Sequence, residues 1–189
     1  MGSILDLAVF KKECDAFPSQ FASLQLATVS ASGEPEASYA PFVEKDGRYY
    51  IFVSELAAHT HNLRHHPQCS ALFIEDETSA SHVFGRKRLT LSCEVTHCPR
   101  DEAKFDVVLN AFEEKFGRFI EVLRKLADFH LYELQPVRGA FVAGFAKAFV
   151  LEGNGLSEFR HRNEVGHQTT GKAHQSEMDA LAAPNRTAH

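Results

Sequence analysis

The spacing of apolar residues along the chain changes several times. Apolar positions recur every three or four residues in Ile4–Cys14 and again in Phe105–Leu126. That spacing is typical of amphipathic helices, because 3.6 residues make one turn. Gly117 interrupts the second series, which predicts two helices there rather than one. A shorter helix is expected within Glu55–Pro67, since proline ends a helix.

Strand-like segments fill most of the remaining chain. Period-two alternation or a short apolar run marks Ser23–Ser30, Ala37–Glu44, Arg48–Ser54, Cys69–Ile74, Arg88–Cys98, Phe129–Leu134 and Ala140–Val150. Asp46–Gly47 predicts a tight hairpin, and Pro136–Gly139 predicts a turn between the last two strands. Six or seven strands at hairpin spacing, with helices between them, predict an α+β protein built on an antiparallel β-barrel with peripheral helices.

The composition changes after Glu152. The last 37 residues hold 4 of the 11 glycines, 4 of the 11 histidines and few large apolar residues. Such a segment cannot form a core of its own. We therefore expect one barrel domain over residues 1–152 and a flexible C-terminal tail over residues 153–189.

Charge and composition exclude some classes of partner. The net charge is −5, whereas proteins that bind nucleic acid or anionic membranes usually carry excess lysine and arginine. No apolar run is long enough to span a bilayer, and the N-terminus lacks signal-peptide features, so a cytoplasmic location is expected. The four cysteines are expected to be reduced thiols in strands or core: Cys14, Cys69, Cys93 and Cys98.

Histidines in the tail could bind a metal or cofactor. His167 follows Gly166, and a histidine on a glycine-flanked segment can fold onto a bound group. Neutral imidazole is an axial ligand of haem iron, and His161 and His174 lie in the same segment as His167. A polar tail whose histidines have no function is the alternative interpretation.

Two other clusters are candidates for chemistry. His61 and His65 share a helix face, but without a third ligand a solvated face is preferred. His59 and Thr60, at the start of the same helix, are better placed to point at a ligand on the barrel surface. Arg86 and Arg88 share one strand face and form a candidate anion clamp, or else only keep a strand edge soluble.

Six stretches of the sequence resemble a known family. Leu26–Val29, Gly33–Phe42 and Asn62–Pro67 resemble the pyridoxamine-phosphate-oxidase-like split-barrel superfamily. Within it, the chain is similar to the haem-utilisation (HugZ/HutZ-type) branch at Phe112–Gly117, Leu126–Phe129 and Arg138–Ala148. The resemblance implies a homodimeric split barrel that binds haem b between protomers. It also implies oxidative degradation of haem by O₂ and an external electron donor to a biliverdin-type product, releasing iron for acquisition.

The resemblance also implies roles for single residues. Gly166–His167 matches the branch's C-terminal Gly-His pair, which makes His167 the proximal iron ligand and a catalytic residue, with His161 as the alternative. Asp128 matches an acidic residue that hydrogen-bonds the ligand histidine across the dimer. The remaining cofactor-binding positions are His59, Arg86 and Arg88.

Two other functions stay open from sequence. The same superfamily uses FMN, and the strand with Arg86 and Arg88 could hold a phosphate as readily as a haem propionate. An FMN-dependent oxidoreductase is therefore one alternative. A non-catalytic haem storage or transfer protein with the same ligands is the other.

Overall fold

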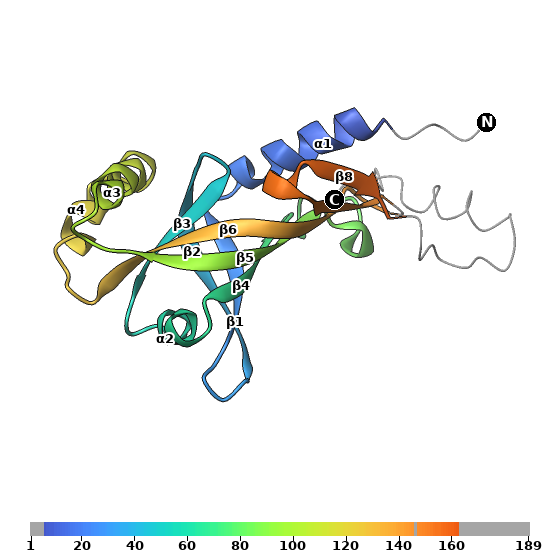
Figure 1. The fold of residues 1–189 in the computed structure, drawn as a ribbon. Coiled ribbons are helices and arrows are strands. Elements are labelled where there is room, and N and C mark those ends of the chain that lie inside the picture. Colours follow the sequence, from blue (N-terminus) through green and yellow to red (C-terminus); the bar gives the residue numbers. More distant parts are fainter. Residues whose placement is uncertain (1–5, 146, 163–189) are drawn as a thin grey trace, which may run out of the picture. The chain divides into compact units, whose positions relative to one another are not determined.

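The computed structural model describes residues 6–145 and 147–162 (Figure 1). The helices are α1 (Leu7–Ala16), α2 (Ala58–His65), α3 (Ala103–Phe116) and α4 (Phe119–Leu123). The strands are β1 (Ser23–Val29), β2 (Pro35–Lys45), β3 (Arg48–Ser54), β4 (Gln68–Ile74), β5 (Arg88–Cys98), β6 (Phe129–Val142), β7 (Ala148–Glu152) and β8 (Glu158–His161). Short 3₁₀ turns lie at Phe17–Gln20, Val83–Gly85 and Asn154–Leu156.

The chain divides into two compact units, and β4, β5 and β6 run from one into the other. Residues 21–72 and 91–137 form what we call the barrel unit. Of the described residues, 6–20, 73–90, 138–145 and 147–162 belong to the second, which we call the terminal unit.

Six strands close into an antiparallel barrel. Their order is β3-β2-β1-β4-β5-β6, and β6 returns to pair with β3 in a register that places Tyr49 opposite Leu134. β1 pairs with β2 and β4, and β2 pairs with β3 through the hairpin at Asp46–Gly47. Both hairpin residues have positive φ, 54° and 73°, as a two-residue turn of this kind requires. The predicted antiparallel split barrel with peripheral helices is confirmed.

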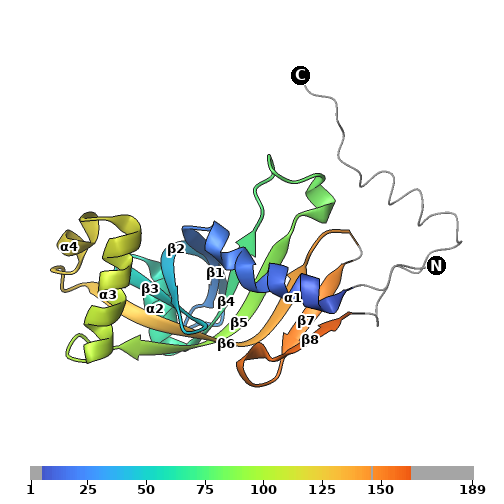
Figure 2. The same ribbon diagram turned by 90° about the horizontal axis from the view of Figure 1, so that it is seen from above.

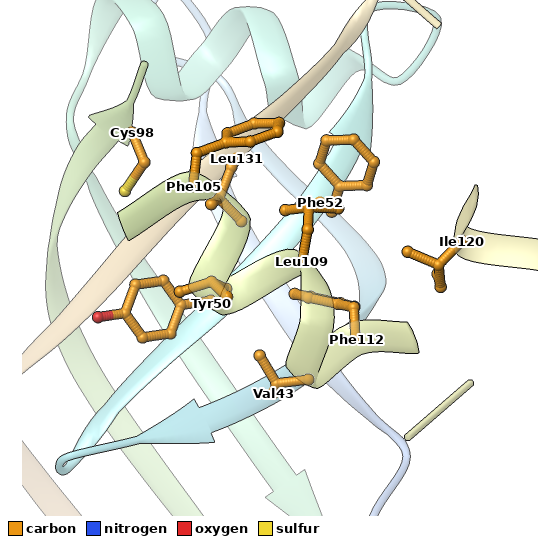
Figure 3. Packing of buried hydrophobic residues seen from close by; sticks show 10 residues of the cluster. Val43, Tyr50, Phe52, Cys98, Phe105, Leu109, Phe112, Ile120 and Leu131 are labelled. Atoms are coloured by element: carbon orange, nitrogen blue, oxygen red, sulfur yellow. The ribbon is translucent and has the colours of Figure 1, made fainter. Parts of the chain in front are cut away.

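A dense apolar cluster lies between α3 and the strands β3 and β6 (Figure 3). Phe105, Leu109 and Phe112 recur on one face of α3, as the period of the sequence predicts. They pack against Phe52 and Leu131, which come from β3 and β6. This cluster anchors α3 to the strands that close the barrel.

The helical stretch breaks at Gly117, as predicted. Gly117 ends α3 with φ 79° and ψ −172°, and its amide donates to the Glu113 carbonyl at 2.8 Å. L-residues rarely adopt that conformation, whereas glycine, without a Cβ, adopts it easily.

Replacing Gly117 by alanine is therefore expected to cost about 1–2 kcal/mol of unfolding free energy. A Cβ at this position would meet nothing within 4 Å, so the cost comes from the backbone and not from a clash. Urea unfolding measures it, with Glu114→Ala on the exposed last turn of α3 as the control. Equal stability of the two variants would contradict the assignment of strain.

The terminal unit is held by stacked aromatic rings. In this unit β6 pairs with β7 and β7 with β8, and α1 runs along β8 (Figure 2). The Phe149 ring on β7 lies 4.9 Å from Phe10 of α1 and 4.8 Å from Phe159 of β8, centroid to centroid. Phe17 meets Phe141 edge-on at 5.8 Å. Much of the phenylalanine in this unit is therefore used for packing.

Two predictions about the C-terminal half were wrong. The expected turn at Pro136–Gly139 is part of one continuous strand, β6, and the chain reverses instead between Val142 and Ala148. β6 pairs with β3 up to Leu134 and with β7 from Gly139, so the missing amide of Pro136 falls between these two ladders.

The second correction concerns the expected tail. Residues 158–161 form β8 and pair with β7, because Phe159 supplies an apolar side chain that stacks on Phe149. The prediction that the tail is flexible falls mainly on residues 163–189, which lie outside the described residues.

All four cysteines are free and buried, which confirms the expectation of reduced thiols in the core. Burial raises the pKa of the Cys14 thiol to about 12, and burial likewise raises that of Cys98. Thiols with raised pKa values and little exposure are poor nucleophiles. Among the described residues, no helix is both long enough and apolar enough to cross a membrane.

Candidate functional site

His59 lies in the first turn of α2 and is buried, only 7% exposed. Its Nδ1 is 2.9 Å from the Ser38 hydroxyl on β2. Its Nε2 is also buried but meets no hydrogen-bond partner among residues 6–145 and 147–162. Burial lowers the pKa of His59, while the nearby Glu36 carboxylate opposes this in part. The side chain is a neutral imidazole with one nitrogen still to be satisfied.

The shift in the pKa of His59 predicts an acid-sensitive contribution to stability. The folded-state value lies below the ordinary 6.5, so the unfolded chain takes up the proton first as pH falls. The contribution of His59 is present above 6.5 and is lost as pH falls through the folded-state pKa. His59→Gln should therefore cost more stability at about pH 8 than at about pH 5.

Urea unfolding at both pH values checks this, with His65→Gln on the exposed side of α2 as the matched control. A cost for His59→Gln that grows on acidification would show the opposite linkage.

Asp128 lies immediately before β6 and is fixed by the end of β3. The Ser54 hydroxyl donates to Asp128 Oδ2 at 2.9 Å, and the Glu55 amide donates to the Asp128 carbonyl at 2.8 Å. The other carboxylate oxygen, Oδ1, accepts no hydrogen bond from the part of the chain that the structure describes. Asp128 is half-buried. Its Oδ2 is held in place by Ser54, and its Oδ1 can still accept a hydrogen bond from another donor.

Ser54 also joins Asp128 to the start of α2. Its carbonyl accepts a hydrogen bond of 2.6 Å from the Thr60 hydroxyl, and its hydroxyl accepts from the Leu56 amide at 3.1 Å. Thr60 is fully buried, so it serves the fold and does not point at a ligand on the barrel surface as expected.

The predicted basic pair, Arg86 and Arg88, lies in the terminal unit but plays two different parts. Arg86 donates twice to the Glu75 carbonyl, at 2.8 and 2.5 Å, and forms an ion pair with Glu77 at 2.9 Å. Arg88 makes a 3.1 Å hydrogen bond from Nη1 to the Arg86 carbonyl and no ion pair within the described ranges. Lys87, between them, pairs with Glu13 of α1 at 2.5 Å. Arg88 therefore has more free N–H donors for binding an anion than Arg86 or Lys87.

Of the two candidate iron ligands, His161 is among the described residues and His167 is not. His161 is at the end of β8, half-buried, with its ring centroid 5.3 Å from that of Phe149 at a steep interplanar angle of 71°. His167 lies outside the described residues. The terminal unit thus holds Arg86, Arg88 and His161, and the barrel unit holds His59 and Asp128.

Sequence reasoning missed a cluster in the barrel unit. Glu55 pairs with Arg64 of α2, and Glu55 Oε1 and Arg64 Nη2 each lie 2.8 Å from His130 Nε2 on β6. The members come from separate elements, and nothing in their local spacing signals that they meet. Within residues 6–145 and 147–162, no group of three or more His, Cys, Asp or Glu side chains is placed to hold a metal ion.

Comparisons with known proteins agree with this fold. The family model for pyridoxamine 5'-phosphate oxidase matches residues 10–143. The protein named heme oxygenase HutZ from Vibrio cholerae is 42% identical over 156 residues, covering 82% of this chain and 88% of that protein. These matches and the closed barrel define the class, a pyridoxamine 5'-phosphate oxidase-like split barrel. The chain belongs to the haem-utilisation, HutZ-type group of this superfamily.

Two solved structures support the same placement. The structure of HutZ, described as the heme storage protein of Vibrio cholerae, is 42% identical with a TM-score of 0.64. The match covers 67% of this chain and 89% of the HutZ chain. The structure of Campylobacter jejuni ChuZ is 32% identical, with a TM-score of 0.78. The match covers 100% of this chain and 69% of the ChuZ chain.

Proposed function

We propose that this protein binds haem b as a homodimer and degrades it to a biliverdin-type product, releasing iron. The degradation uses O₂ and electrons from an external donor. The observation that carries the proposal is the 42% identity, over 82% of the chain, to the Vibrio cholerae protein named heme oxygenase HutZ. The resemblance of Phe112–Gly117 and Arg138–Ala148 to the haem-utilisation branch supports it independently of the superfamily motifs.

The donor set suits haem. Propionates are carboxylates, and the Arg88 guanidinium, with no ion pair among the described residues, can bind one through two parallel hydrogen bonds. Arg86 supports Arg88 through its carbonyl, while its own guanidinium is held by Glu75 and Glu77. The unpartnered Nε2 of buried His59 is a further polar contact for a ligand. When bound, haem supplies the redox-active iron at which O₂ is activated.

His167 is the proposed iron ligand, and Asp128 of the partner protomer is its proposed support. Ser54 holds one oxygen of the Asp128 carboxylate, so the other can accept a hydrogen bond from the second ring N–H of the ligand histidine. That hydrogen bond fixes the tautomer of the imidazole and raises its basicity. Asp128 therefore tunes the electron density that reaches the iron more than it holds the haem.

Asp128→Asn is accordingly expected to lower the rate of haem degradation about 10- to 100-fold. Hemin affinity should change much less, since the iron ligand and Arg88 remain. Soret-monitored hemin titration gives the affinity, and pigment formation with ascorbate in air gives the rate. Asp101→Asn, an exposed carboxylate before α3, is the control. Equal losses of affinity and rate would assign Asp128 to haem binding itself.

Hemin titration also distinguishes the proposal from its alternatives. A Soret band that saturates at one haem per protomer is expected. A purified protein that carries a flavin spectrum and shows no Soret band on hemin addition would instead support an FMN-dependent oxidoreductase, the activity that the pyridoxamine 5'-phosphate oxidase match favours. The description of the Vibrio cholerae structure as a heme storage protein favours storage as the other candidate, which turnover measurements separate.

A further inference from the structure

A cavity of about 400 Å³ opens in the barrel unit, apart from every residue assigned to haem. Its volume is within the range of pockets that bind small molecules. It is formed by α2, β5, β6 and the residue that follows α2 by two positions. The lining residues are Leu63, Arg64, Pro67, Val95, His97, His130 and Tyr132.

The Tyr132 hydroxyl is a polar group without a partner in this cavity. Tyr132 is only 2% exposed, and its hydroxyl oxygen finds no hydrogen-bond partner among the residues that the structure describes. Burial raises the pKa of Tyr132, and the Arg64 guanidinium opposes this effect in part. A buried phenol that lines a cavity is stabilised when a ligand or a water molecule accepts a hydrogen bond from its hydroxyl.

Arg64 adds donors to the same cavity. Its hydrogen bonds to Glu55 and His130 both use Nη2. Nε and Nη1 take part in neither of these two bonds, so a guanidinium edge is left for a ligand. Because Glu55 balances the charge of Arg64, the free N–H donors, and not an excess of positive charge, favour a ligand that carries an acceptor group such as a carboxylate.

Two imidazoles complete the polar side. The His97 ring lies 5.7 Å from the His130 ring and 5.4 Å from the Tyr132 ring, centroid to centroid. Burial lowers the pKa of His97, and the neighbouring His130 and Arg64 lower it further. The Glu102 carboxylate opposes these effects in part. His97 is therefore a mainly neutral imidazole at pH 7, and a bound anion would favour its protonation.

The rest of the lining is apolar. Leu63 and Val95 are buried, and Pro67 lies after α2. These side chains would be covered by a hydrocarbon body but not by a small hydrated anion such as phosphate. The cavity therefore joins one polar face, which carries N–H and O–H donors, to one apolar face.

We propose that this cavity is a binding site for a small monocarboxylate with an apolar body. The carboxylate accepts hydrogen bonds from the Tyr132 hydroxyl and the Arg64 guanidinium. The body packs on Leu63, Pro67 and Val95. The site goes beyond the proposed haem chemistry and does not depend on it.

Benzoate is the probe, added to the haem-free full-length protein and followed by the ¹H–¹³C imidazole resonances in NMR. The resonances of His97 and His130 should shift and saturate, and the pKa of His97 should rise in the complex because an anion favours imidazolium. Tyr132→Phe removes one donor without changing the shape of the ring and should weaken benzoate binding about tenfold. His65→Gln, on the exposed side of α2, should bind benzoate as the parent does.

Three results would overturn the proposal. The first is the absence of a saturable shift of His97 up to tens of millimolar benzoate. The second is equal binding by neutral benzamide, which would remove the role of charge. The third is unchanged affinity in both Tyr132→Phe and Arg64→Gln, whose thermal unfolding midpoints verify that each is folded. Hemin titration of Tyr132→Phe should match the parent, and a loss of hemin affinity would instead merge this cavity with the haem site.

Discussion

His167→Ala is expected to lower haem degradation at least about 100-fold and to change the ferric haem spectrum. The substitution removes the proposed iron ligand itself, the imidazole that Asp128 supports, so the loss should exceed that of a supporting residue. Absorbance from the Soret region to the visible bands measures the ligation, and ascorbate-driven pigment formation measures the rate. Hemin should still bind, more weakly, through Arg88.

His161→Ala is the matched control for His167→Ala. His161 belongs to β8 and packs edge-on against Phe149, so its loss should leave the ferric spectrum unchanged. If His161→Ala alone changes the spectrum, the ligand is His161. If neither substitution changes it, the C-terminal segment supplies no iron ligand.

Phe112→Ala is expected to cost about 3–5 kcal/mol of unfolding free energy. The Phe112 ring is 1% exposed and lies 6.5 Å from Phe52 and 5.8 Å from Phe116, between centroids. Figure 3 shows Phe112 and Phe52 within the same cluster. Truncation would remove buried apolar surface and leave a cavity between α3 and β3. The midpoint of urea unfolding should fall while its slope stays constant.

Phe119→Ala provides the matched control for Phe112. Both are phenylalanines on helices of the barrel unit, but Phe119 is 66% exposed on α4, so its truncation should cost less than about 0.5 kcal/mol. A loss below about 1 kcal/mol for Phe112→Ala would mean that the cluster is not packed as described.

Local features of the fold could be predicted from sequence because each is determined by a few neighbouring residues. The hairpin at Asp46–Gly47 and the helix break at Gly117 follow from the conformations that glycine allows. The turn wrongly placed at Pro136–Gly139 shows the limit of such reasoning. Whether a proline ends a strand depends on which partner strand needs its amide, and that depends on pairings distant in sequence.

Interactions between distant elements were beyond sequence reasoning. The buried Glu133 accepts a hydrogen bond from Tyr50 at 3.0 Å and pairs with Arg48 and Lys104 at 2.9 and 2.8 Å. No periodicity indicates that a strand carboxylate will meet three donors from two other elements. The sequence indicated which side chains could bind an anion or a metal, but the assignment of these residues to haem came from resemblance to a family. The cavity at Tyr132 could be found only in the structure.

The central claim, that the protein degrades haem, is tested most directly by incubating its hemin complex with ascorbate in air and without oxygen. In air, the Soret band should disappear while a bile-pigment absorbance and chelatable iron appear. Without oxygen, reduction of the iron should shift the Soret band but not abolish it, because ring opening consumes O₂. A Soret band that persists in air, with no pigment and no released iron, would contradict the account and show that the protein stores haem.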